Sequence, residues 1–155
     1  MSSEVIYFRA KEADIYQLAA TMRAEEIQEV YALAGYTPEE ALRKSFLASR
    51  DAYSAFAGDT ILAMFGIRPY SLVSHTASPW LLTSQARANR YSRELLRSSR
   101  EAIAHWRQDY SLLVNEIDAR YTQSIRWAAW LGFTVGEPRP LGILGLPFCR
   151  VEIRS

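Results

Sequence analysis

Apolar positions follow two different periods along the chain, and the changes of period divide it into strands and helices. Residues 5–10 are β-branched and aromatic, which predicts a strand, and residues 12–35 then carry apolar side chains at helical spacing. We expect one helix there, ending at Gly35. Thr37 precedes a proline and lies three positions before Glu40, which is the order of an N-terminal capping box, so a second helix begins at this point.

The remainder of the chain predicts a hairpin and then alternating helices and strands. Two apolar runs flank the Gly58-Asp59 turn and predict an antiparallel hairpin over about 52–68. The Pro/Gly spacing of residues 138–147 indicates an ordered, extended loop. The other predicted elements are a buried strand at 78–84, a long amphipathic helix within 85–110, a strand at 110–118, a helix at 121–132, and strands at 133–137 and 147–154. This order predicts a mixed α/β (α+β) fold with one sheet of about six or seven strands flanked by helices, and the hairpin argues against a doubly wound sheet.

Size and composition narrow the class of protein. A chain of 155 residues with 49% hydrophobic and 23% charged residues is expected to form a single globular domain over 1–155. The single cysteine, Cys149, excludes an internal disulfide, and His75 and His105 lack a second ligand at a metal spacing, so we expect no metal site. The polar start and the absence of an 18-residue apolar run favour a cytoplasmic protein without a membrane segment.

The net charge of +1 means that attraction to an anionic partner requires a local patch. One face of the long helix supplies a candidate patch, formed by Arg93, Arg97, Arg100 and Arg107. Two interpretations remain open: a solvated face, or a binding surface for nucleic acid or an acidic protein. Trp127 and Trp130 are expected in the core and in a partner contact, as part of an apolar patch.

The 110–118 strand contains Leu113 and Val114, and the following helix contains Ser124 and Ile125 and ends in Leu131-Gly132-Phe133. Together with the element order, these residues resemble the GNAT superfamily of acetyl-CoA-dependent N-acetyltransferases. Gly132 can adopt the left-handed conformation that closes a helix, and Phe133 then opens a strand. The resemblance implies that the fourth strand leads to a helix that holds the CoA pyrophosphate. An open cleft between the fourth and fifth strands would favour an enzyme, and a cleft filled by side chains would favour a structural role.

The cofactor loop implied by the resemblance departs from the family pattern. Its pattern of Gln or Arg, two residues, Gly, one residue, and Gly or Ala falls on Gln85, Ala88 and Arg90, so neither glycine is present. If acetyl-CoA binds, we expect these three residues to hold it together with Leu82 and Thr83, with Arg90 as a cation for phosphate.

The helix after the fifth strand also lacks the expected working residues. The positions of the family's Asn and Tyr fall on Tyr121 and Ala128, and Ala128 has no proton to donate. Tyr121 is expected to pack with its hydroxyl in water. Glu116 and Asp118 are the only carboxylates expected nearby, and Asp118 is expected to cap a turn. We therefore predict no catalytic residue.

Residues 118–153 are also similar to internal virion or morphogenesis proteins of short-tailed phages, through "Asp-Ala-Arg", "Ser-Ile-Arg-Trp", "Trp-Leu-Gly-Phe" and "Gly-Leu-Pro-Phe". This resemblance implies a phage structural or assembly protein that binds no cofactor, contacts other virion proteins, and lies in the infected cell's cytoplasm or in the particle. One alternative is an N-acetyltransferase with a divergent pyrophosphate loop. Another is a protein that binds nucleic acid or an acidic partner through the arginine face.

Overall fold

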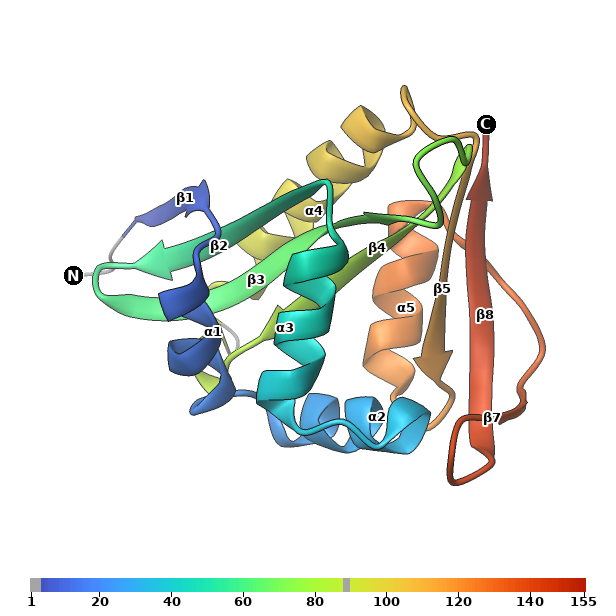
Figure 1. Cartoon of the computed structure of the whole chain (residues 1–155), viewed down its shortest axis with the longest axis horizontal. Helices are drawn as coiled ribbons and strands as arrows, with labels where there is room; N and C mark the ends of the chain where they lie inside the picture. Colours follow the sequence, from blue (N-terminus) through green and yellow to red (C-terminus); the bar gives the residue numbers. More distant parts are fainter. Residues whose placement is uncertain (1–3, 88–89) are drawn as a thin grey trace.

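A computed structural model describes residues 4–87 and 90–155. Its centre is one eight-stranded sheet with the order β1-β2-β3-β4-β5-β8-β6, in which β7 also pairs with β8 (Figure 1). The strands are β1 (Val5–Arg9), β2 (Asp51–Ala57), β3 (Thr60–Pro69), β4 (Thr76–Thr83), β5 (Leu112–Asp118), β6 (Thr134–Val135), β7 (Arg139–Leu141) and β8 (Leu146–Arg154). All neighbouring pairs are antiparallel except β4 and β5, which are parallel.

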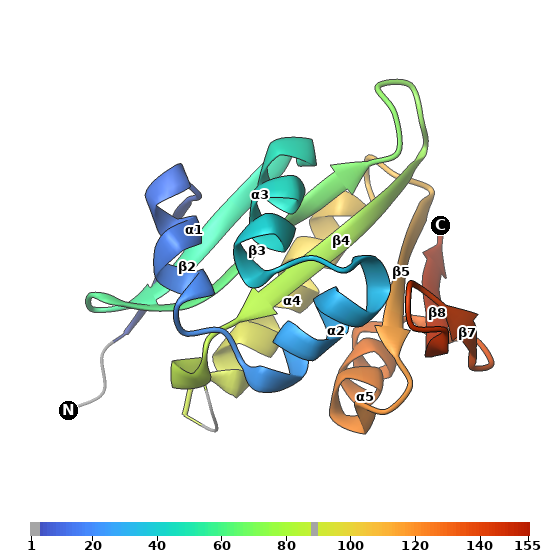
Figure 2. The same ribbon diagram turned by 60° about the horizontal axis from the view of Figure 1, so that its bottom comes forward.

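Helices cover both faces of the sheet (Figures 1 and 2). The α-helices are α1 (Glu12–Ala19), α2 (Ala24–Ala34), α3 (Pro38–Ala48), α4 (Ser92–Trp106) and α5 (Thr122–Leu131), and a 3-10 turn, η1 (Gln85–Arg87), follows β4. Buried residues of α1 and α3 pack on β3 and β4 on one face, and those of α4 and α5 pack on β3, β5 and β8 on the other. No helix in the described ranges is long and apolar enough to cross a membrane.

The turns predicted from local residue chemistry are confirmed. Thr37 accepts a hydrogen bond from the Glu40 backbone N–H at 3.2 Å, and the Glu40 carboxylate accepts from the Thr37 N–H at 3.1 Å. Gly58 takes a positive φ in the β2–β3 turn. Gly35 and Gly132 both adopt the left-handed conformation that ends a helix.

The single helix predicted over 12–35 is wrong, because the chain forms α1 and α2 with a break between them. At the break Met22 pairs with Ser84, and the Arg23 N–H donates to the Thr83 carbonyl at 3.1 Å. The helical spacing of apolar residues continues across the break because Met22 is buried, but its backbone pairs with the end of β4. This pairing directs α2 across the ends of β4 and β5.

Other boundaries also differ from the predictions. The helix expected within 85–110 is confined to α4, with η1 before it, and the extended loop over 138–147 contains β7 and a turn. Gly142 and Gly145 have positive φ in that turn. The sheet consequently has eight strands, slightly more than predicted.

Candidate functional site between β4 and β5

The parallel strands β4 and β5 separate soon after they begin. They pair only at Thr76 with Leu112 and at Ala77 with Leu113. Beyond these pairs the Asn115 side-chain amide crosses the gap and donates to the Pro79 carbonyl at 2.8 Å. A cavity of about 180 Å³ occupies the gap, with walls from α2, α4, α5 and the strands. The cleft between the fourth and fifth strands is therefore open.

One edge of β4 faces this cavity. The Pro79 carbonyl points toward β5, and the Thr83 N–H, also on that edge, donates to the Glu26 carboxylate at 2.9 Å. Because backbone groups alternate along a strand, the N–H and C=O of Leu81 face the gap between these two positions. The Thr83 hydroxyl also donates to Glu26, at 2.5 Å, so α2 holds the end of β4. Leu82, in contrast, turns its side chain into the core beneath α1.

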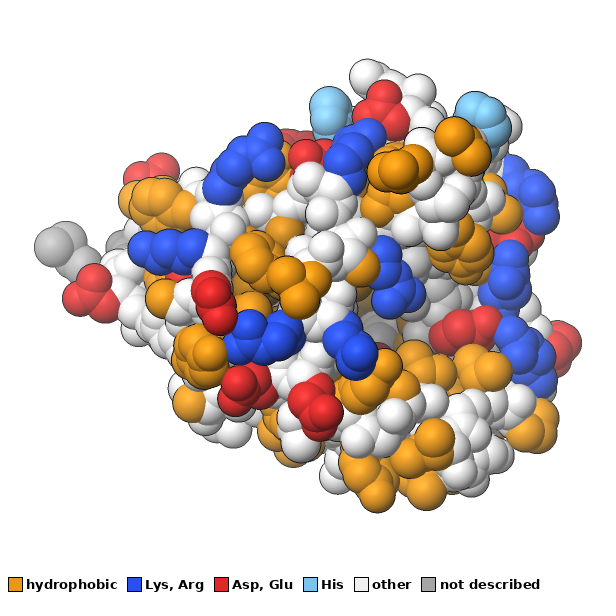
Figure 3. Space-filling model, viewed as in Figure 1, with side chains coloured by type: hydrophobic (Ala, Val, Ile, Leu, Met, Phe, Trp, Pro, Cys, Tyr) orange, Lys and Arg blue, Asp and Glu red, His pale blue; other side chains and the backbone are white. Residues whose placement is uncertain are grey.

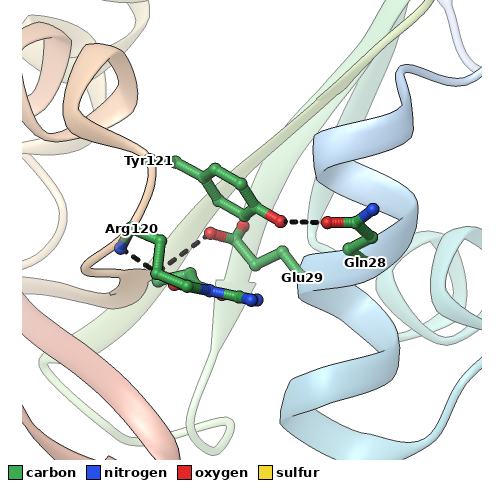
Figure 4. Close-up of polar contacts among 5 residues, drawn as sticks. Gln28, Glu29, Arg120 and Tyr121 are labelled. Atoms are coloured by element: carbon green, nitrogen blue, oxygen red, sulfur yellow. Dashed lines mark hydrogen bonds and ion pairs between the residues drawn. The ribbon is translucent and has the colours of Figure 1, made fainter.

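Glu29, on α2, is a carboxylate whose acidity the fold changes strongly. Its Oε2 accepts the Asp118 backbone N–H at 2.9 Å, and it lines the cavity. Burial raises the pKa of Glu29 from 4.5 to about 7, opposed by the Asp118 N–H and reinforced by the Asp118 carboxylate. Figure 4 shows Gln28 and Glu29 extending from α2 toward Arg120 and Tyr121. A carboxyl group with this pKa can exchange a proton at neutral pH.

Asp118 has the capping role predicted for it. Its side chain is fully buried and accepts hydrogen bonds from the Arg120 backbone N–H at 3.0 Å and from the guanidinium at 2.7 Å. Burial acts to raise the pKa of Asp118, but the bonds from Arg120 outweigh it and hold that pKa below its usual value. Asp118 therefore stays ionised and orders the turn that positions its own N–H against Glu29.

Glu116, the second predicted carboxylate, points into the cavity from β5. Its Oε1 pairs with the Arg139 guanidinium at 2.5 Å. Its Oε2 is buried and accepts no hydrogen bond from the residues that the structure describes. A buried acceptor without a donor is costly, so this oxygen is suited to a donor supplied by a ligand.

Of the residues predicted to hold phosphate after β4, only some are positioned to contact a ligand. Gln85 uses its backbone N–H to bind the Thr21 carbonyl at 2.9 Å, so that amide is not offered to a ligand. Ala88 lies outside the described residues. Arg90 is exposed, with its guanidinium 5.6 Å from the centre of the Tyr91 ring, near the start of α4.

Tyr121 and Ala128, the two positions compared with the family's working residues, lie at the start of α5 and within it. The Tyr121 hydroxyl lies at the exposed surface, where it donates to Gln28 on α2 at 2.8 Å (Figure 4). This bond joins the start of α5 to α2 outside the cavity wall. Ala128 does line the cavity and is 6% exposed, but it carries no acidic group.

The residues predicted to contact a partner, the α4 arginines with Trp127 and Trp130, are exposed except for Trp127, which lines the cavity. The four arginines are all exposed, opposite the buried face of α4. Arg97 pairs with Glu94 at 3.7 Å, and Arg100 lies over the Trp130 ring at 4.7 Å from its centre. Trp130 is 49% exposed, whereas Trp127 lines the cavity. Arg93 and Arg107 complete the exposed set. Across the described ranges, no three His, Cys, Asp or Glu residues gather as a metal site.

The comparisons with known proteins identify the architecture. No protein-family model matches the chain, and no curated protein matches it in sequence. A spermidine N-acetyltransferase from Vibrio cholerae, solved with CoA and spermine, matches with a TM-score of 0.73 at 8% identity, over 97% of this chain and 95% of that one. The chain has a GNAT-like fold.

Two further solved structures have the same fold as this chain. A ribosomal-protein-alanine N-acetyltransferase from Brucella melitensis has a TM-score of 0.71 at 19% identity, over 97% of this chain and 99% of that one. A putative acetyltransferase from Salmonella typhimurium, solved with acetyl-CoA, has a TM-score of 0.66 at 15% identity, over 97% and 93% of the two chains. The GNAT-like fold predicted from the element order is confirmed.

The prediction of a phage structural or assembly protein is contradicted by these acetyltransferase structures, and the expected absence of a cofactor gains no support from them. The motifs behind the phage resemblance have local structural causes. "Trp-Leu-Gly-Phe" ends a helix at Gly132, and "Gly-Leu-Pro-Phe" leaves the turn that starts β8. Such motifs follow the architecture and do not by themselves indicate a virion protein.

Sequence reasoning missed Glu26 and Glu29. Their spacing of three residues places both on one side of α2, which is the only local signal they carry. The position of that side over the β4–β5 gap depends on the break between α1 and α2, which the apolar periodicity conceals.

Proposed function

We propose that this protein is an N-acetyltransferase that moves an acetyl group from acetyl-CoA to an amine. The observation that carries the proposal is the open gap between β4 and β5, with Glu29 in its wall and a pKa near neutrality. A core that served only as a scaffold would be expected to fill this gap with side chains. The likeness to acetyltransferases of the same fold supports the same conclusion.

The cavity is suited to the amide-bearing arm of CoA. An extended chain of amides can pair with an open strand edge, and Leu81 offers one N–H and one C=O there. The wall on the α4 and α5 side is mainly apolar, with residues such as Ile103, Ala128 and Phe133, and its polar members are Ser99, Gln123 and Ser124. For the phosphates, Arg90 and Arg93 lie beside the start of α4. The positive charges of Arg90 and Arg93 would thus bind the phosphates in place of the glycine-rich backbone of the family pattern.

Bound acetyl-CoA would supply the acetyl group as an activated thioester. The protein's task is then to deprotonate the amine and to hold it in the gap. Glu29 Oε2 is fixed by the Asp118 N–H, which leaves Oε1 to take a proton from the ammonium of the acceptor. Glu116 Oε2 can accept a second N–H of the same amine. Proton transfer to Glu29 would leave the nitrogen lone pair available to attack the thioester carbonyl. The C–S bond would then break, and the second proton lost by the nitrogen would go to the departing CoA thiolate.

The test compares wild-type protein with Glu29→Gln, and with Glu25→Gln as a control on the exposed side of α2. Acetyl-CoA binding is measured by thermal stabilisation, and transfer by release of CoA thiol in the presence of a panel of amines. We expect all three proteins to bind acetyl-CoA, and Glu29→Gln to lose about 10²- to 10⁴-fold in turnover.

Saturating acetyl-CoA at a hundred times its dissociation constant should stabilise the folded state by about 2.7 kcal/mol. The absence of any stabilisation, or full turnover by Glu29→Gln, would overturn the proposal.

A further inference from the structure

A second cavity adjoins the first on the other face of the sheet. It has a volume of about 190 Å³ and lies between α2, α3 and the strands. Figure 3 shows this face hollowed between α2, α3 and β5, with basic side chains at the rim. The two cavities share the wall formed by Glu29, Trp80, Leu81, Asn115 and Glu116. The two cavities therefore adjoin at the β4–β5 gap, one on the α4/α5 side and one on the α2/α3 side.

The second cavity has opposite charges at its two ends. Both of its carboxylates, Glu29 and Glu116, belong to the shared wall at the gap. Its two cations, Lys44 on α3 and Arg68 on β3, line the second cavity alone. Both cations are exposed, and neither forms an ion pair within residues 4–87 and 90–155. Lys44 is held with its Nζ 5.3 Å from the centre of the Tyr36 ring.

The two ends of the second cavity favour ligand groups of opposite charge. At the gap, the buried Glu116 Oε2 accepts no hydrogen bond from the described residues, and an ammonium carries three donors and a compensating charge. At the far end, the Lys44 ammonium has the Glu40 carboxylate of its own helix as an electrostatic neighbour, but neither Lys44 nor Arg68 forms an ion pair within the described residues. The two cations favour an anion, for which a carboxylate offers two oxygens. Between the ends, Val30, Leu33 and Leu82 provide an apolar wall.

We propose that the acceptor is an amino-acid-like amine, with a carboxylate directed to Lys44 and Arg68, an apolar side chain against α2, and its amino group at Glu29 and Glu116. This assignment rests on the proposed acetyl transfer and names the class of its acceptor. The amino group would lie at the gap, where the acetyl group arrives from the other cavity. A polyamine would place a second cation beside Lys44 and Arg68, which like-charge repulsion disfavours.

The experiment uses the full chain with three apolar amino acids, L-leucine, L-methionine and L-phenylalanine. Each is compared with its decarboxylated amine and with its carboxamide, and spermidine serves as the polyamine. Binding of each amine without acetyl-CoA is measured by calorimetry, and transfer is measured by thiol release. We expect at least one amino acid to have a KM about tenfold or more below those of its decarboxylated amine and its amide.

The variants Lys44→Gln and Arg68→Gln test the far end of the cavity. Each is expected to raise the KM and the Kd of the amino acid by about tenfold while leaving those of the decarboxylated amine unchanged. Arg126→Gln, which removes an exposed cation from α5, is the control and should change neither.

The outcomes separate this inference from the proposed function. Equal use of amino acid and decarboxylated amine, a preference for spermidine, or an amide as good as the acid would overturn the acceptor class while acetyl transfer stands. Failure of acetyl-CoA to bind would remove the proposed function and this inference with it. Amino-acid binding that is unaffected by both variants would also contradict the inference.

Discussion

Replacement of Glu29 by glutamine is expected to remove a pH-dependent loss of stability. Glutamine has nearly the same shape, and its side-chain carbonyl can still accept the Asp118 N–H. The substitution therefore removes the titrating group and leaves the contacts of α2 with the β5 turn in place. The measurement tests the burial of Glu29 without requiring a substrate.

The magnitude follows from the pKa of Glu29 in the two states. A rise from 4.5 in the unfolded chain to about 7 in the folded protein corresponds to about 3 kcal/mol. The folded state binds the proton more tightly, so Glu29 imposes no penalty below pH 4.5, where both states are protonated. As the pH rises from 4.5 through 7, the unfolded chain ionises first and stability falls. Above about pH 8 the loss is complete.

The assay is urea denaturation of both proteins at pH 4.5, 6 and 8, at constant ionic strength. We expect the two proteins to have similar free energies of unfolding at pH 4.5, and Glu29→Gln to be more stable by up to about 3 kcal/mol at pH 8. Glu25→Gln, at an exposed position, should follow the wild type at every pH. A wild-type advantage at pH 8, or the same pH dependence in both proteins, would refute the reasoning that burial raises this pKa.

Two further substitutions test how the gap is built. Asn115→Ala removes two hydrogen bonds: the one from its side-chain amide across the gap to Pro79, and the one that its side-chain oxygen accepts from the Glu116 N–H. The free energy of unfolding is expected to fall by about 1–2 kcal/mol. An unchanged urea midpoint would show that Asn115 does not join the strands. Gly66→Ala would bring a Cβ to 2.4 Å from the Asp51 carbonyl oxygen, and thermal unfolding is expected to show a loss of about 1–3 kcal/mol in stability. Gly145→Asn should be nearly neutral, because nothing lies within 4 Å of the added Cβ and asparagine tolerates the positive φ. Equal stability of these two variants would contradict the packing argument.

Much of the fold was accessible from the sequence because its signals are local. The capping box at Thr37 and the left-handed glycine at Gly132 each depend on residues within one turn of the chain. The Gly58-Asp59 hairpin depends only on its turn and on the apolar runs beside it. Such features keep the same meaning in any tertiary setting, and the element order they define was enough to predict a GNAT-like sheet.

The site was less accessible because its residues meet through tertiary contacts. Glu116 and Asp118 were recognised as candidates because they lie at the end of a strand that the sequence reveals. Glu29 was not, since its helix is nearly ninety residues earlier in the chain and its acidity depends on burial against Asp118. Lys44 and Arg68 carry no local sign of their role, because neither has a motif and each faces the second cavity from a different element.

The sequence by itself determined where most strands and helices begin and end, since caps, turns and apolar periodicity act over a few residues. Tertiary structure decided that the helical pattern over 12–35 breaks, because pairing of Met22 with Ser84 outweighs one more helical turn. It also decided that β4 and β5 separate and that α2 brings Glu29 to the opening. A carboxylate on an amphipathic helix is ordinarily a solvated group, and only burial by distant residues converts it into one that can titrate near neutral pH.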